Sequence, residues 1–403
     1  MLASKFRYAV RPLAPSAMTT PPKTNGLPFH ARIAVTVMFL LNGTVFASWV
    51  PHIPAVKARL DINDGQLGLL LLCIAAGSIA SLALSGWLVA RFGSRRVTVA
   101  AAIGLCLMLP VPVVSASTFV VAASLALFGV FNGALDVAMN AQAVEVQRRY
   151  GRSIMSAFHG CFSLGGLIGA GLAGLLLKLG VPGLEHASAI TAVGLLSAVL
   201  AGSWLLPSAR SNTAREPVFV RPTGALLPLG VLALCALLIE GAMADWSAVY
   251  LADAHGASLD VAATGYAVFS LTMAAGRFGG DRLIDRFGVV SILRTCAVLA
   301  TAGLLLTVVG GQAAALAGFA CIGFGMANII PLLFTAAGRV PDVEAGRALA
   351  AVASAGYFGF LVGPPFIGFV AHVLSLPAAF GLMAILCAAL ALRARLVASL
   401  HAS

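Results

Sequence analysis

The chain alternates long apolar runs with short polar connections from residue 31 to residue 396. Each run is about 20 residues or more and holds few charges, which is the length that an α-helix needs to cross a bilayer. The expected spans are 31–50, 65–89, 97–117, 118–144, 154–177, 187–206, 225–250, 260–284, 288–309, 313–337, 347–371 and 377–396. The pattern predicts an all-α membrane protein with twelve transmembrane helices.

Composition supports a membrane protein. Hydrophobic residues make up 60% of the 403 positions and charged residues only 10%, whereas a soluble domain carries about 25% charged residues. The 43 glycines and 19 prolines also suit membrane helices, because small residues allow close helix contacts and neighbouring helices satisfy interrupted backbone groups. A soluble globular fold is therefore excluded.

The net charge of +11 reflects membrane orientation rather than a nucleic-acid partner. Nearly all basic residues fall in alternate connections and in the two tails; only Lys57, Arg59 and Lys178 lie on the other side. Because cytoplasmic loops are enriched in Lys and Arg, both termini are expected in the cytoplasm. The expected location is the inner membrane of a bacterium, and the partners are the lipid bilayer and a small solute.

The sequence lacks the motifs of an enzyme or a metalloprotein. The seven cysteines lie singly in apolar runs, without the spacing of a metal site or a disulfide framework. There is no GxxxxGK[ST], GxSxG or HExxH motif. We therefore expect no cofactor, no metal and no enzymatic activity, and the energy for transport must come from an ion gradient or from the solute's own gradient.

Short motifs recur about 195 residues apart, which indicates two duplicated halves. Ala90–Gly93 (ARFG) returns as Asp285–Gly288 (DRFG), and Asn42 followed by glycine returns as Glu240 followed by glycine. The linker is rich in Ser, Pro and Arg. The predicted units are an N-terminal tail (1–30), a first bundle (31–206), a linker (207–224), a second bundle (225–396) and a C-terminal tail (397–403).

These features resemble the major facilitator superfamily, whose signature follows the second span. The signature residues present here are Gly86, Arg91, Gly93, Arg95 and Arg96, with Asp285, Arg286 and Gly288 in the second copy. Ala90 stands where the family has aspartate. The resemblance implies two six-helix bundles that act as a monomer by alternating access. Spans 4, 5 and 11 resemble more narrowly the uncharacterised bacterial transporters near the fucose–proton symporters.

In the superfamily the signature residues form a latch, in which Arg and Asp side chains pair across helix ends and favour the state closed toward the cytoplasm. Without an acid at Ala90, the first latch here is weaker or uses another acid such as Glu145. A simpler alternative is that Arg91, Arg95 and Arg96 only orient the helices.

The fourth span carries a polar stripe of Asn132, Asp136 and Asn140, each four residues after the last. At about 100° per residue, the three side chains fall within an arc of roughly 80° on one helix face. A charged group inside the bilayer costs about 2.5–3.5 kcal/mol, so this face should meet a cavity or a partner helix. The alternative is that the two amides are hydrogen-bond links between helices.

Other polar residues lie in spans that line the central cavity of the superfamily. They are Asn42 in span 1, Glu240, Asp245 and Trp246 in span 7, and Asn328 in span 10. Alternatives remain for several of them: interhelical links for the asparagines, a rim position for Asp245 and an interfacial role for Trp246. Arg277 is interpreted as snorkelling toward the cytoplasmic surface.

The combined prediction is a secondary transporter that moves a small solute by alternating access. Asp136 and Glu240 are the candidates for proton coupling, because a carboxyl group in the membrane can take a proton from one side and release it to the other. Carboxyl and amide groups can accept and donate hydrogen bonds to the hydroxyl groups of a sugar-like polar solute. The expected mode of transport is symport of this solute with protons. The alternatives are an exporter of hydrophobic or cationic drug-like compounds and, less favoured, a non-transporting membrane sensor.

Overall fold

The computed structural model describes residues 27–151, 154–207, 220–341 and 343–399. Within these ranges twelve helical segments are long and apolar enough to cross a membrane, and no strand occurs in them. This confirms the all-α membrane fold. Most of the predicted tails and linker lies outside the described residues.

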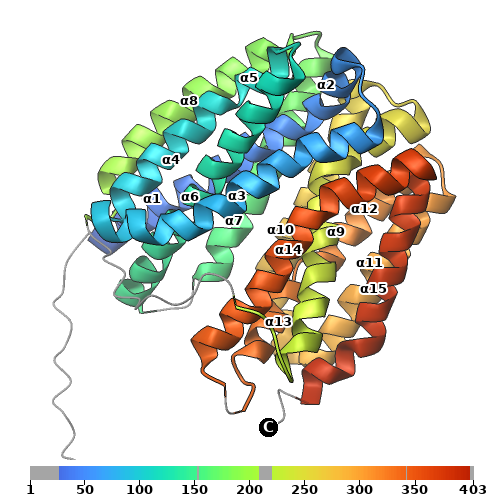
Figure 1. The fold of residues 1–403 in the computed structure, drawn as a ribbon. Helices are drawn as coiled ribbons and strands as arrows, with labels where there is room; N and C mark the ends of the chain where they lie inside the picture. The colour runs from blue at the N-terminus through green and yellow to red at the C-terminus, as the bar shows by residue number, and fades with distance from the viewer. Residues whose placement is uncertain (1–26, 152–153, 208–219, 342, 400–403) are drawn as a thin grey trace, which may run out of the picture.

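The first half runs from α1 to α8 and the second from α9 to α15 (Figure 1). The first half contains α1 (Leu27–Trp49), the 3-10 turn η1 (Val50–His52), α2 (Ile53–Leu60), α3 (Asp64–Phe92), α4 (Ser94–Met108), α5 (Pro110–Val114), α6 (Thr118–Tyr150), α7 (Met155–Lys178) and α8 (Gly183–Trp204). The second half contains α9 (Leu226–His255), α10 (Leu259–Phe287), α11 (Val289–Val309), α12 (Gln312–Met326), α13 (Ile329–Ala337), α14 (Ala345–Val373) and α15 (Leu376–Ser399).

Some predicted span boundaries were wrong, and proline explains two of them. The first span continues through the turn at Pro51 as far as Leu60, because proline is tolerated in the first turn of the new helix. The third span is interrupted before Pro110 and ends at Val114 rather than at residue 117. The tenth span is interrupted between α12 and α13, around Asn328.

The two signature loops have the same backbone geometry. Gly93, between α3 and α4, has φ +83°, and Gly288, between α10 and α11, has φ +79°. Residues other than glycine rarely adopt a positive φ. The repeat in the sequence therefore marks two sharp helix connections that glycine makes possible.

We call the end of the molecule with the loops at Gly93 and Gly288 the arginine-rich end, and the end with the α2–α3 connection the opposite end. The ribbons of the two halves lie together near α2 and diverge toward the arginine-rich end (Figure 1). At the opposite end Lys57 of α2 forms ion pairs of 2.5 Å with Asp64 of its own half and with Asp253 of α9. That end is closed by a charge pair between the halves.

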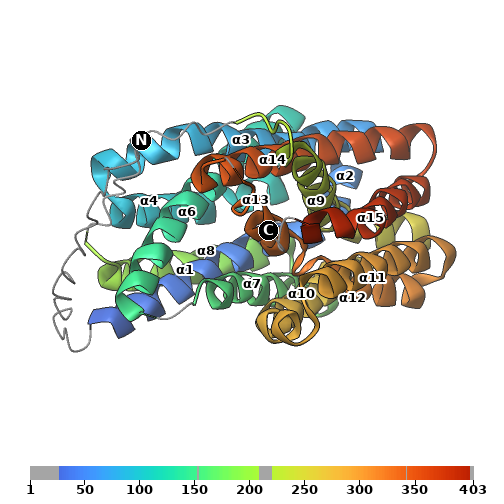
Figure 2. The ribbon, with the colours of Figure 1, turned by 90° about the horizontal axis from the view of Figure 1, so that it is seen from below.

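Two helix pairs, α3 with α14 and α7 with α10, join the halves along their sides (Figure 2). Glycines make these contacts close: a methyl group on Gly68 of α3 would stand 2.7 Å from the Pro364 carbonyl oxygen of α14. Within the first half, a methyl group on Gly165 or Gly169 of α7 would stand 2.3 Å from a backbone oxygen of α1. Small residues thus set the helix spacing, as they commonly do in membranes.

Candidate functional site

A cavity of about 250 Å³ lies between the two halves. Its walls come from α1, α3 and α6–α7 of the first half and from α9, α10 and α14 of the second. The polar lining residues are Ser78, Asn132, Asp136, Glu240, Asp245, Tyr266 and Tyr357, and aromatic rings of Phe46, Phe162 and Phe360 complete the walls. Because both halves contribute, a molecule bound in the cavity would contact both of them.

The polar stripe of α6 faces this cavity. Asn132 and Asp136 line it, and Asn140 lies one turn beyond, where its Nδ2 donates to Asp136 Oδ1 at 3.0 Å and to the Asp136 backbone oxygen at 2.8 Å. Asn140 therefore positions the carboxyl group. Asn132 Oδ1 is out of contact with solvent and has no hydrogen-bond partner in the described part of the chain.

Glu240 of α9 forms an ion pair with Arg277 of α10. Arg277 Nη2 lies 3.2 Å from Glu240 Oε1, and Arg277 Nη1 donates to Ser163 Oγ of α7 at 2.9 Å. The side chain of Arg277 is only 17% exposed, so the interpretation that it snorkels to the surface was wrong. The sequence held one signal for the pair: an arginine inside one apolar span is expected to pair with an acid inside another.

Asp245 lies five residues after Glu240 on α9 and also lines the cavity. It makes no hydrogen bond or ion pair among the residues that the structure describes. Tyr266 of α10 is close enough to interact electrostatically with both Asp245 and Glu240. Of the two positions considered for Asp245, the structure has the cavity rather than the rim.

Four of the expected cavity residues do not line it in this structure. Asn140 lies behind Asp136, as described. Asn42 is 1% exposed and its Nδ2 contacts Met139 Sδ at 3.9 Å, while Trp246 is fully buried. Asn328 donates to the Gly276 backbone oxygen of α10 at 3.1 Å. The tenth span thus packs on α10, and Asn42 and Asn328 act as links between helices.

The signature arginines of the first half surround a separate hollow of about 1090 Å³. Arg91, Arg95 and Arg96 line it together with residues of α8. All these residues belong to the first half, so this larger space is not the cavity between the halves. None of the three arginines forms an ion pair within the described ranges, and Gly86 has open space around it.

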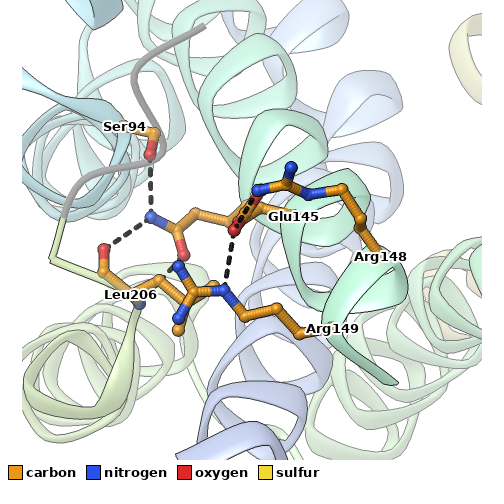
Figure 3. A network of polar contacts seen from close by, with 6 residues as sticks. Ser94, Glu145, Arg148, Arg149 and Leu206 are labelled. Carbon is orange, nitrogen blue, oxygen red and sulfur yellow. Dashed lines mark hydrogen bonds and ion pairs between the residues drawn. The ribbon is translucent and has the colours of Figure 1, made fainter. Parts of the chain in front are cut away.

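The predicted replacement acid of the latch is occupied elsewhere. Glu145 of α6 pairs with Arg148 and Arg149 of its own helix at 2.7 Å each (Figure 3), so it does not engage the signature arginines. In the second copy Asp285 is exposed and makes no ion pair among the described residues, while Arg286 lies over the Phe287 ring at 5.3 Å. The latch is not formed among the residues that the structure describes.

Sequence reasoning missed Gln142, which connects three segments at the arginine-rich end of the first half. Its Nε2 donates to Ser94 Oγ at 2.8 Å and to the Leu206 oxygen at 3.0 Å, and its Oε1 accepts from the Leu206 backbone N–H at 3.0 Å (Figure 3). The side chain is fully buried. It joins α4, α6 and the end of α8, so the signature loop is fixed to its own bundle.

Two six-helix halves around a polar central cavity define an α-helical membrane transporter. A sequence model of the Major Facilitator Superfamily matches residues 35–337 and 229–401. The chain is 40% identical to an uncharacterised MFS-type transporter of Yersinia pestis, over 91% of this chain and 95% of that one. It is 36% identical to the membrane protein MosC of Rhizobium meliloti, over 85% and 84% of the two chains. The chain belongs to the major facilitator superfamily and is a transport protein, not an enzyme.

Solved structures with the same fold include the nucleoside transporter NupG and a D-xylose–proton symporter. NupG superposes with a TM-score of 0.71 at 12% identity, over 92% of this chain and 99% of that chain. The symporter superposes with a TM-score of 0.70 at 16% identity, over 90% and 97%. At these identities the likeness concerns the fold. The narrower resemblance to the fucose–proton symporters stays a prediction.

Proposed function

We propose that this protein moves a small solute by alternating access and couples the movement to protons through Asp136. The observation that carries the proposal is a carboxyl group on the wall of a cavity shared by both halves, held in place by Asn140 at 3.0 Å. A carboxyl group there is costly to leave charged, so taking up and releasing a proton can be linked to the opening of either end. The sugar–proton symporter of the same fold supports proton coupling by analogy.

We infer that the arginine-rich end faces the cytoplasm of a bacterial inner membrane, because basic residues gather in cytoplasmic loops. In this orientation the charge pair between Lys57 and Asp253 closes the outer side, and the halves diverge toward the cytoplasm. The unpaired signature residues support an inward-facing state. The latch of Asp285 and Arg286 would form when the halves close at this end.

Reconstitution into liposomes tests this function. Liposomes that contain the purified protein and a trapped pH indicator are expected to show a proton flux when a transported solute is added outside. Liposomes without the protein should show none. A panel should hold a pentose, a nucleoside and a small amine. A protein that binds one of these compounds without any solute or proton flux would be a sensor, and the transport proposal would be wrong.

A further inference from the structure

Two polar groups on the cavity wall have no partner within the part of the protein that the structure describes: one is a carboxyl group and the other an amide oxygen. Asp245 makes no hydrogen bond or ion pair in the described ranges, and Asn132 Oδ1 is likewise without a partner. Both residues line the cavity, from opposite halves. A carboxylate has only acceptor atoms, so the missing partner must bring donors.

The basic side chain that contacts the cavity residue Glu240 is fully engaged. Arg277 binds Glu240 at 3.2 Å and Ser163 at 2.9 Å, and therefore compensates the charge of Glu240 rather than that of Asp245. Asp136 differs too, because one of its oxygens accepts from Asn140. Of the three acids that line the cavity, Asp245 alone has neither a basic partner nor an amide donor among the described residues.

The walls around the acids are aromatic. Phe46, Phe162, Phe360, Tyr266 and Tyr357 contribute rings from both halves, and ring faces attract cations by about 0.5–2 kcal/mol each. The volume of about 250 Å³ exceeds the roughly 150 Å³ of a cavity that holds benzene. The cavity therefore has room for a small molecule with about one ring and a single polar group.

We propose that the substrate is a small organic amine, bound as its ammonium ion by Asp245 of α9, with Asn132 of α6 accepting a further hydrogen bond. An ammonium group carries one positive charge and up to three donors, which matches the two unfilled positions. It would also connect the halves, since α6 and α9 belong to different bundles. This assignment rests on the proposed transport function and leaves Asp136 free to take the proton.

The test compares benzylamine with benzyl alcohol, which have the same ring and similar size but differ in charge. Binding to the purified full chain is measured by calorimetry near pH 7, without any gradient. Benzylamine should bind at least tenfold more tightly than benzyl alcohol. Asp245→Asn should remove this preference, and Asp245→Glu, which keeps the charge, should retain much of it. The matched control is Asp61→Asn, on the exposed α2–α3 connection, which should behave as wild type.

Several results would overturn the assignment: equal binding of the two compounds, no binding of benzylamine at millimolar concentration, or tighter binding of xylose. A preference that survives in folded Asp245→Asn would do so as well. Thermal unfolding of each variant shows whether it is folded. Because binding needs no gradient, binding without flux would contradict the transport function alone, whereas flux of neutral solutes only would contradict the amine assignment alone.

Discussion

Asp136→Asn is expected to abolish proton-driven accumulation while substrate exchange between two loaded faces survives. The amide resembles a carboxyl group that is permanently protonated, so the step that releases the proton is lost. Exchange needs no such release, and Asp245 still provides a charge for the substrate. In liposomes, accumulation driven by a pH gradient should fall to background, and counterflow of labelled substrate should stay within a few-fold of wild type.

The control for this variant is Asp61→Asn, which removes a carboxylate at an exposed position and should leave both activities unchanged. Loss of accumulation and exchange together in folded Asp136→Asn would make Asp136 a substrate-binding group. A loss of expression before any loss of transport would make it a structural one. Full gradient-driven uptake in the variant would contradict proton coupling through this residue.

Glu240→Gln is expected to destabilise the protein strongly. The substitution leaves Arg277, whose side chain is 17% exposed, without its acid. Removing one partner of a fully buried ion pair commonly costs about 3–5 kcal/mol, and this pair is part-buried, so the loss should lie toward the lower end of that range. The melting temperature in detergent should fall by several degrees, and the yield of folded protein should fall with it.

The double variant Glu240→Gln/Arg277→Gln is the decisive comparison. It removes both charges, so it should recover much of the stability that the single variant loses, and the coupling energy follows from the double-mutant cycle. If Glu240→Gln is as stable as wild type but loses proton-driven transport, the acid takes part in coupling, as the sequence suggested. The ion pair with Arg277 favours the structural role.

The spans could be predicted because their length and apolar character follow from the bilayer itself. The interruptions were harder to locate. The break before Pro110 and the break around Asn328 stand beside other helices, and at the second one the Asn328 side chain donates to the Gly276 oxygen of α10. Hydropathy within one span holds no information about that neighbour.

The residues of the candidate site that could be predicted are those whose charge is energetically costly inside the membrane. Asp136 and Glu240 stand out because charge in a membrane is expensive, and both line the cavity. Asn42 was expected in the cavity because its span lines the cavity in the superfamily, but a span has several faces, and Asn42 lies against Met139. Ion pairs between residues far apart in the sequence, such as Lys57 with Asp253, cannot be predicted from residue spacing.

Distances between spin labels at the two ends of the molecule test the central claim of alternating access most directly. One pair is placed at Asp61 and Ala257, at the opposite end, and another at the exposed Ser203 and Arg339, at the arginine-rich end. The seven cysteines are first replaced. The two conditions compared with wild type at neutral pH are acid pH and Asp253→Asn, which breaks the pair with Lys57. We expect reciprocal changes: where the distance at the opposite end lengthens, the distance at the arginine-rich end shortens. Distances that stay fixed under both conditions, or that lengthen together at both ends, would contradict alternating access in this protein.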